Sequence, residues 1–183
     1  EISPVNGRAR VDFIDGNKKA FDCVYARYAP AMFGICRRYT NCMDDANEVL
    51  QESFVKVYEH RKKMDPTKEL GPWIKTITIR TAINFLRKQK RMVLQENDAF
   101  FETIQEEEAP ISTAGFKEKL LKMLSQLPDG YRAVFNMYVL DGLTHKEIAD
   151  YLEISEGTSK SQLAKAKNWI KNKLEKELKD ERI

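Results

Sequence analysis

Apolar residues recur at intervals of three and four along most of this chain of 183 residues, and this spacing constrains its fold more than any other feature. One face of an α-helix returns every 3.6 residues, whereas a half-buried strand alternates with a period of two. Alternating runs rich in Val, Ile and Thr, which mark strands, are few. The spacing therefore predicts an all-α protein.

The first half of the chain contains four predicted helices. The first follows Asn17, and Pro30 suits the first turn of the second. The third is predicted over about 44–60, and its acidic beginning matches the positive end of a helix dipole. The fourth is predicted over about 73–91 and is strongly basic.

A sharp change of charge follows the fourth helix. No acidic residue lies between Leu70 and Gln95, whereas residues 96–108 contain acidic residues and no basic one. The net charge of +3 conceals this asymmetry. The change predicts an exposed linker over 94–113 between two domains. The acidic run is either a solubilising tether or a segment that occupies a positively charged channel or covers the basic helix.

The second half of the chain has the pattern of a helix-turn-helix. A helical segment breaks at Pro128, resumes and ends at Gly142. Thr144 and Glu147 then form a capping box that starts a short helix. A connection over 153–156 leads into a longer helix. Two short helices joined by a tight turn are typical of DNA-binding domains, although a plain core-forming hairpin fits the pattern as well.

The longer helix has one narrow apolar side centred on Leu163. Turning about 100° per residue places Thr158, Ser161 and Lys165 on the opposite side. No acidic residue occurs over 160–173. This polar side is either solvated or lies in a groove lined with phosphates.

Several classes of site are not indicated. Cys23, Cys36 and Cys42 form no CxxC pair, which predicts neither a structural metal nor a disulfide. The chain shows no nucleotide-binding glycine loop and no nucleophile beside a general base, so we expect no cofactor and no enzyme. No apolar run approaches the roughly 20 residues that span a bilayer, and residues 1–10 lack a signal-peptide core. We expect a soluble, cytoplasmic protein without membrane insertion.

Two stretches carry a resemblance to a known family. The stretch from GNKKAFDCVY to FVKVYEH, followed by GPWIKTITIRTAINFLRKQKR, resembles region 2 of bacterial sigma factors. The stretch LSQLPDGYRAVFNMYVLDGLTHKEIADYLEISEGTSKSQLAKAKNWI resembles region 4. Their order and short connection are similar to the extracytoplasmic function (ECF) group. The resemblance implies a region 2 helical bundle over 1–93, the acidic linker over 94–113 and a region 4 helix-turn-helix over 114–183.

The resemblance also implies a role for particular residues. The core polymerase would be bound, at the coiled coil of its largest subunit, by Asp45, Glu48, Gln51 and Glu52. The loop over 64–72 would capture a flipped base of the −10 element. The residues that would recognise and melt this element are Lys68, Lys75, Thr76, Arg80, Asn84, Arg87, Lys88 and Arg91. The −35 element would be read in the major groove by Thr158, Lys160, Ser161, Gln162 and Lys165. The implied partners are core RNA polymerase, at its largest-subunit clamp and its flap, promoter DNA and an anti-sigma factor.

Five residues depart from the family pattern. Ser159 stands where Val is common and faces inward, which weakens helix packing. Gln162 stands where Arg is common, and Glu153 stands in the turn where Gly is favoured for its positive φ. Arg80 and Asn84 replace the usual Asn and Asp, which indicates a different promoter sequence.

Two other functions account for part of the sequence. An autonomous helix-turn-helix regulator explains the second domain but leaves the acidic third helix and the basic fourth helix unexplained. A helical interaction protein that mimics a sigma domain would keep its activity after Lys160 and Lys165 were replaced by Glu.

Overall fold

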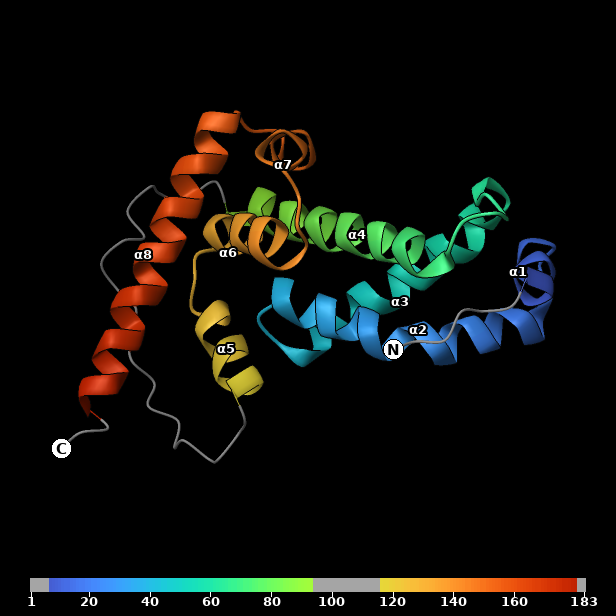
Figure 1. Cartoon of the computed structure of the whole chain (residues 1–183), viewed down its shortest axis with the longest axis horizontal. Coiled ribbons are helices and arrows are strands. Elements are labelled where there is room, and N and C mark those ends of the chain that lie inside the picture. Colours follow the sequence, from blue (N-terminus) through green and yellow to red (C-terminus); the bar gives the residue numbers. More distant parts are fainter. Residues whose placement is uncertain (1–6, 94–115, 181–183) are drawn as a thin grey trace. The chain divides into compact units, whose positions relative to one another are not determined.

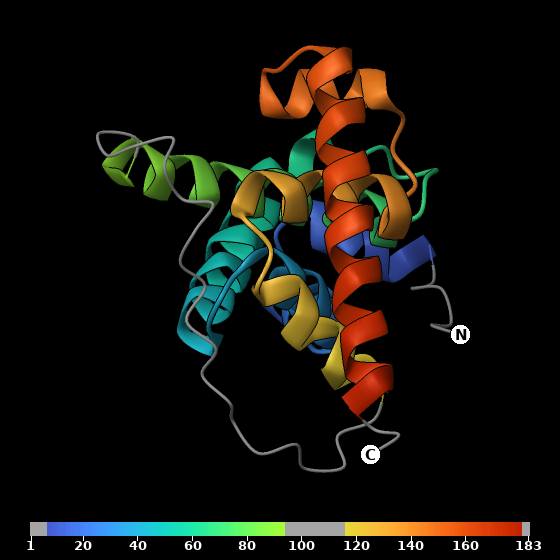
Figure 2. The ribbon, with the colours of Figure 1, turned by 90° about the vertical axis from the view of Figure 1, so that its left-hand side faces the viewer.

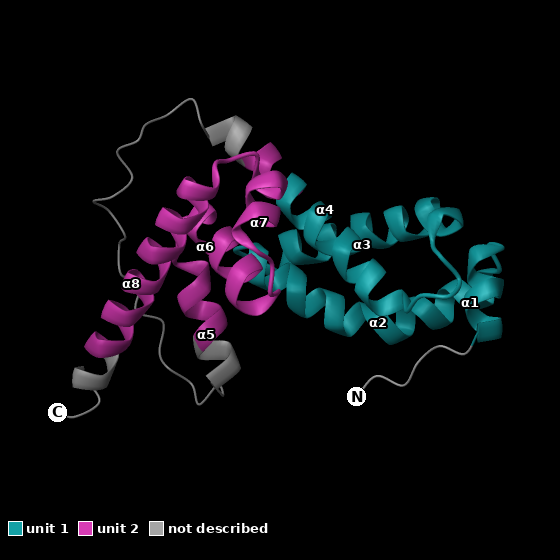
Figure 3. Cartoon of the chain, turned by 45° about the horizontal axis from the view of Figure 1, so that its top comes forward, with its two compact units in different colours: residues 1–84 teal, residues 85–183 magenta. Residues whose placement is uncertain are grey.

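The computed structural model describes residues 7–93 and 116–180, and both ranges are helical without strands (Figures 1 and 2). The all-α prediction is confirmed. The predicted acidic linker over 94–113 lies outside the described residues. The chain divides into two compact units over 1–84 and 85–183, which are described separately below (Figure 3). None of the described helices has the length and apolar character needed to cross a bilayer.

Unit 1 is a bundle of helices in which α2 packs along α3. Its elements are α1 (Gly7–Ile14), α2 (Lys18–Tyr39), α3 (Met43–His60), the 3-10 turn η1 (Arg61–Lys63) and most of α4 (Leu70–Val93). The side chain of Asn17 caps α2 by accepting hydrogen bonds from the backbone N–H groups of Lys19 and Ala20. The predicted third and fourth helices are confirmed as α3 and α4, whereas the sequence pattern did not predict α1.

The prediction of two helices separated at Pro30 is wrong, because α2 continues through Pro30. Proline lacks the N–H that would bond to the carbonyl of Ala26, and in a helix interior this costs about 3 kcal/mol or more. The buried side chains of Val24, Tyr28 and Met32 lie on one continuous helical face on both sides of the proline. Burial of that face offsets the lost hydrogen bond, and the helix therefore continues through the proline.

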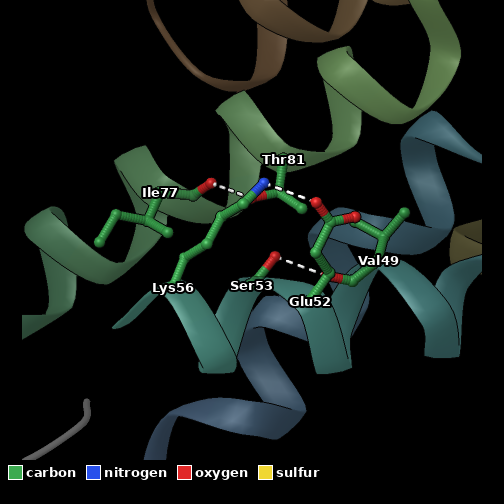
Figure 4. A network of polar contacts seen from close by, with 6 residues as sticks. All are labelled: Val49, Glu52, Ser53, Lys56, Ile77 and Thr81. Atoms are coloured by element: carbon green, nitrogen blue, oxygen red, sulfur yellow. Dashed lines mark hydrogen bonds and ion pairs between the residues drawn. The ribbon is translucent and has the colours of Figure 1, made fainter. Parts of the chain in front are cut away.

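A polar network joins α3 to α4 (Figure 4). Lys56 Nζ donates to Glu52 Oε1 at 2.7 Å and lies 3.5 Å from Thr81 Oγ1. The buried hydroxyl of Ser53 donates to the Val49 carbonyl at 2.6 Å, so it is satisfied within its own helix. These bonds pair polar side chains that lie between the two helices.

Unit 2 is a helical domain with its own apolar core. Its elements are the end of α4, α5 (Phe116–Ser125), α6 (Asp129–Phe135), the π-helical turn η2 (Asn136–Leu140), α7 (His145–Leu152) and α8 (Glu156–Asp180). Leu124, Leu127 and Ala166 are buried together, and Trp169 packs against them. Trp169 is half-buried on this core.

Arg132 is a charged group inside this domain, with none of its side chain exposed. Its Nη2 donates to Asp129 Oδ1 at 2.6 Å, and Nη1 lies 3.4 Å from the carbonyl oxygen of Ser125. Burial lowers the pKa of Arg132, and the negative charge of Asp129 opposes that effect. The arginine thus links the end of α5 to the beginning of α6.

Candidate nucleic-acid and protein interfaces

The residues predicted to bind core polymerase all lie on α3. Glu48 and Gln51 are exposed, whereas Asp45 and Glu52 are half-buried. The Cys42 Sγ atom accepts the backbone N–H of Asp45 at 3.4 Å and so caps the helix at its acidic end. The carboxylate of Glu52 is already paired with Lys56, a residue that the sequence analysis did not single out.

Two apolar side chains extend this exposed side of α3. Val55 and Tyr58 follow Gln51 by one and two turns, and 55% and 38% of their surfaces are exposed. The Tyr58 ring packs edge-on against Phe21 at 5.3 Å, and the guanidinium of Arg61 lies 4.1 Å from its centre. The outer side of α3 is therefore acidic at its beginning and apolar at its end. Their spacing of four and seven residues from Gln51 was the available signal, but the sequence does not say which apolar positions stay exposed.

The loop between η1 and α4 has an ordered backbone. Asp65 Oδ1 accepts hydrogen bonds from the N–H and hydroxyl of Thr67 at 2.9 and 2.7 Å. These bonds hold the pKa of the Asp65 carboxyl below its usual value, with a smaller contribution from the charge of Lys68. Met64 and Leu70 are buried at the two ends, while the side chains between them are exposed. Trp73, just beyond, is half-buried and packs edge-on against Phe13 at 6.5 Å.

The polar residues of α4 fall into two groups. Arg80, Asn84 and Lys88 are exposed and follow one another at intervals of four, so they form one row along the helix. Lys75, Thr76 and Arg87 are half-buried, and Lys68 is exposed in the preceding loop. Thr76 donates its hydroxyl to the Pro72 carbonyl at 3.0 Å. The side chain of Arg91 lies outside the described residues.

The capping box at the start of α7 and the turn between α7 and α8 both have the predicted form. The side chain of Thr144 accepts the N–H of Glu147, and the Glu147 carboxylate accepts the N–H of Thr144 at 2.8 Å, which confirms the capping box. The hydrogen bonds that the carboxylate accepts from the N–H and the hydroxyl of Thr144 lower the pKa of Glu147. Glu153 adopts φ 53° and ψ 46°, the left-handed conformation that glycine adopts at no steric cost. Ser155 Oγ then accepts the N–H of Thr158 at 2.9 Å and caps α8.

The residues predicted to read the −35 element lie in the first turns of α8. Lys160, Ser161 and Lys165 are exposed, and Lys165 Nζ lies 5.9 Å from the centre of the Tyr131 ring. The hydroxyl of Thr158 is half-buried and lies 2.9 Å from that of Ser155. Gln162 is half-buried, and its Oε1 atom accepts no hydrogen bond from the described residues. Its amide must turn outward to pair bidentately with adenine.

Ser159 is completely buried, as the sequence predicts, and it has a polar partner that the sequence did not reveal. Its Oγ atom lies 2.9 Å from His145 Nδ1, and the His145 ring stacks on Tyr138 with centroids 4.5 Å apart. The buried hydroxyl is thus satisfied across the two helices.

The described residues contain no cluster of three or more side chains suited to hold a metal ion. Cys23, Cys36 and Cys42 are free thiols, and burial raises the pKa of Cys36 to about 12.

Comparison with known proteins places both units. The family model for sigma-70 region 2 matches residues 24–92, and that for sigma-70 region 4 matches residues 117–170. The chain is 30% identical over 151 residues to the ECF RNA polymerase sigma factor SigM of Bacillus subtilis, covering 82% of this chain and 92% of that protein. It is 25% identical over 171 residues to the ECF RNA polymerase sigma-E factor of Haemophilus influenzae, covering 87% and 90%.

Solved structures show the same fold. The sigma factor RpoE of Bartonella quintana, in complex with the anti-sigma factor NepR, matches with a TM-score of 0.55 and 20% identity over 86% of this chain and 98% of that one. CnrH, in complex with the cytosolic domain of CnrY, matches with a TM-score of 0.54 and 18% identity over 92% and 96%.

Proposed function

The chain belongs to the ECF sigma factors of bacterial RNA polymerase. We propose which of its residues bind core polymerase and which recognise each promoter element. As a sigma factor it binds core polymerase and promoter DNA and directs transcription initiation. Sigma factors are non-enzymatic initiation factors, so the polymerase performs the catalysis. We assign region 2 to residues 1–93, the linker to 94–113 and region 4 to 114–183. The protein acts in the cytoplasm, where its DNA and polymerase are.

Core polymerase is bound by the exposed side of α3. Asp45, Glu48, Gln51 and Glu52 share that helix, and Glu48 and Gln51 present the most accessible polar groups. An acidic surface complements a basic coiled coil and speeds its encounter. Glu52 contributes mainly through its bond to Lys56, which fixes the adjoining turn against α4.

The row formed by Arg80, Asn84 and Lys88 is the observation that carries the assignment of α4 to the −10 element. Three exposed polar side chains, two of them cationic, at one-turn intervals give a continuous track for the backbone of a separated strand. Lys75, Thr76, Arg87 and Arg91 belong to the same helix, and Lys68 lies in the loop that captures the extruded base.

The first turns of α8 read the −35 element. Lys160 and Lys165 reach phosphates or guanine, while Thr158, Ser161 and Gln162 face base edges. An autonomous helix-turn-helix regulator is not favoured, because it leaves the region 2 match over 24–92 without a role. Two solved structures of this fold contain anti-sigma factors or a cytosolic partner domain. We infer that an anti-sigma factor also controls this chain.

Run-off transcription with cognate core polymerase and genomic fragments tests the proposal. The wild-type protein should produce discrete new transcripts, and the variant Glu48→Lys/Gln51→Lys should abolish them by preventing assembly with the core. Asp22→Lys is the matched control, because it reverses an exposed acidic charge on α2. Unchanged transcripts from the α3 variant would refute the assigned core-binding side. If the wild-type protein gives no transcript and binds promoter duplex alone with nanomolar affinity, the autonomous regulator would be favoured.

A further inference from the structure

We infer that Arg10 of α1 is a positioning residue for promoter melting: it fixes the backbone of the loop over 64–69 in the shape that captures the extruded −10 base. The inference rests on the proposed function of that loop. Arg10 lies ahead of the segment that matches the region 2 model, which begins at residue 24. The contact therefore adds a residue from outside the matched segment to the recognition machinery.

The guanidinium of Arg10 contacts the loop at its backbone. Nη1 donates to the carbonyl oxygen of Lys68 at 2.7 Å, across a sequence separation of 58 residues. The same nitrogen lies 3.8 Å from Glu69 Oε1. Only 15% of the Arg10 side chain is exposed, against 56% for Glu69. A short hydrogen bond from a charged, largely buried donor is a strong constraint, whereas the exposed ion pair adds little.

The rest of the loop is ordered from within. Asp65 holds Thr67 through two hydrogen bonds, and the N–H of Lys68 donates to the Asp65 carbonyl at 3.0 Å. These bonds shape residues 65–68 as one turn but do not tie that turn to a helix. The Lys68 carbonyl is the point at which α1 holds it. Arg10 therefore converts a locally ordered turn into one with a fixed place in unit 1.

A fixed backbone matters for this loop because its proposed function is to distinguish one extruded base from another. The exposed side chains over 65–69 can distinguish one extruded base from another only if the backbone that carries them does not adapt to each base. Ordering a loop during binding also consumes binding free energy, which an existing anchor spares. Arg10 itself is committed to the Lys68 carbonyl, so it acts through the loop.

The test uses reconstituted holoenzyme and a labelled single strand that carries the −10 element of a promoter located by run-off transcription. Arg10→Met keeps the buried stem and removes the donors, and Arg10→Lys restores one charged donor. We expect Arg10→Met to lower the preference for the matched strand over a single-base variant about tenfold, with Arg10→Lys in between. Affinity for core polymerase should not change. Arg8→Ala, an exposed arginine of the same helix, is the matched control.

Hydrogen exchange in the protein without polymerase provides a second readout. The amides of Thr67 and Lys68 should exchange about tenfold faster in Arg10→Met, while those of α3 keep their protection. Unchanged exchange at the loop, or unchanged base preference, would overturn the inference. So would a fall in the salt dependence of strand binding without a loss of preference, because that result identifies a direct phosphate contact.

The two proposals fail differently. If wild-type holoenzyme does not bind the −10 strand, the assigned function of the loop is wrong, yet the exchange experiment still decides whether Arg10 anchors it. If Arg10→Met does not fold, Arg10→Lys carries the test. A base preference below that of Arg8→Ala together with faster loop exchange would support the anchor, and values equal to those of Arg8→Ala would overturn it. Loss of preference in Arg8→Ala would overturn the assignment to Arg10.

Discussion

The imidazole of His145, at the start of α7, shares a hydrogen bond with the buried hydroxyl of Ser159 in α8, with Nδ1 and Oγ 2.9 Å apart. Either atom can be the donor, depending on the tautomer of the ring. The bond joins the two helices of the helix-turn-helix. The bond therefore fixes the orientation of α8 against α7, because a hydrogen bond requires donor and acceptor to be aligned as well as close.

Removing one member of this pair should destabilise the domain. Ser159→Ala leaves a half-buried imidazole nitrogen without its partner and should cost about 1–2 kcal/mol in free energy of unfolding. His145→Phe should cost a similar amount by stranding the hydroxyl. Urea unfolding of both single variants and the double variant measures the coupling, expected at about 1 kcal/mol. Strict additivity would show that the hydrogen bond contributes nothing.

Replacing Glu153 by glycine should stabilise the turn. A non-glycine residue in the left-handed region pays about 1–2 kcal/mol, part of which glycine returns through its greater freedom in the unfolded chain. We expect Glu153→Gly to raise the free energy of unfolding by about 0.5–1 kcal/mol in urea titration. Glu153→Ala is the control, since it removes the same side chain but keeps the strained backbone, and it should not stabilise.

The ion pair between Arg132 and Asp129 should be far more sensitive to removal of one partner than of both. Asp129→Ala removes the carboxylate that pairs with the buried guanidinium and should cost about 3 kcal/mol. Adding Arg132→Met removes that charge and should recover part of the loss. Thermal and urea unfolding report the difference; a double variant less stable than Asp129→Ala would contradict the account.

Stability should depend on pH through Glu147. Because the capping-box hydrogen bonds lower its pKa in the folded protein below the ordinary 4.5, the stabilising effect is present above that value and is lost as the pH falls through the folded pKa. Glu147→Gln keeps an acceptor and cannot titrate. Measured by urea midpoints, the stability difference between wild type and this variant should shrink as the pH falls from above 4.5 through the folded pKa of Glu147. A difference that stays constant would rule out the linkage.

Phosphate and base contacts of α8 should separate in holoenzyme binding to −35 duplexes. Lys160→Ala should weaken binding evenly across sequences and reduce the salt slope by about 1. Gln162→Ala should instead relax discrimination at one base pair by about 1–3 kcal/mol. Asn172→Ala, further along the exposed side, is the control. Equal effects of both variants on all sequences would show that Gln162 reads no base.

The sequence predicted helices best where their pattern is long. The apolar spacing over about 44–60 and about 73–91 identifies α3 and α4, and Thr144 with Glu147 marks the start of α7 through bonds between near neighbours. The prediction of a helix break at Pro30 was wrong because it considered only the hydrogen bond lost at the proline. The burial of the apolar face of α2 on both sides of Pro30 outweighs that loss. The helix α1 is too short for its period to stand out.

Contacts between distant residues could not be predicted from spacing. The positive φ of Glu153 follows from a local turn and was foreseen, but the partner of Ser159 lies 14 residues away on another helix. The pairing of Glu52 with Lys56 was within reach as an i,i+4 pair, whereas the approach of Lys56 to Thr81 depends on how α3 meets α4. Such contacts require the packed structure.

The bond from Arg10 to the Lys68 carbonyl also sets a rule for protein engineering. Grafting residues 64–72 onto another sigma factor would transfer the loop's side chains and its internal turn, but the acceptor of the anchoring bond would arrive without its donor. A chimera meant to move promoter preference must therefore exchange α1 together with the loop, as two separate pieces of sequence that make one transferable part.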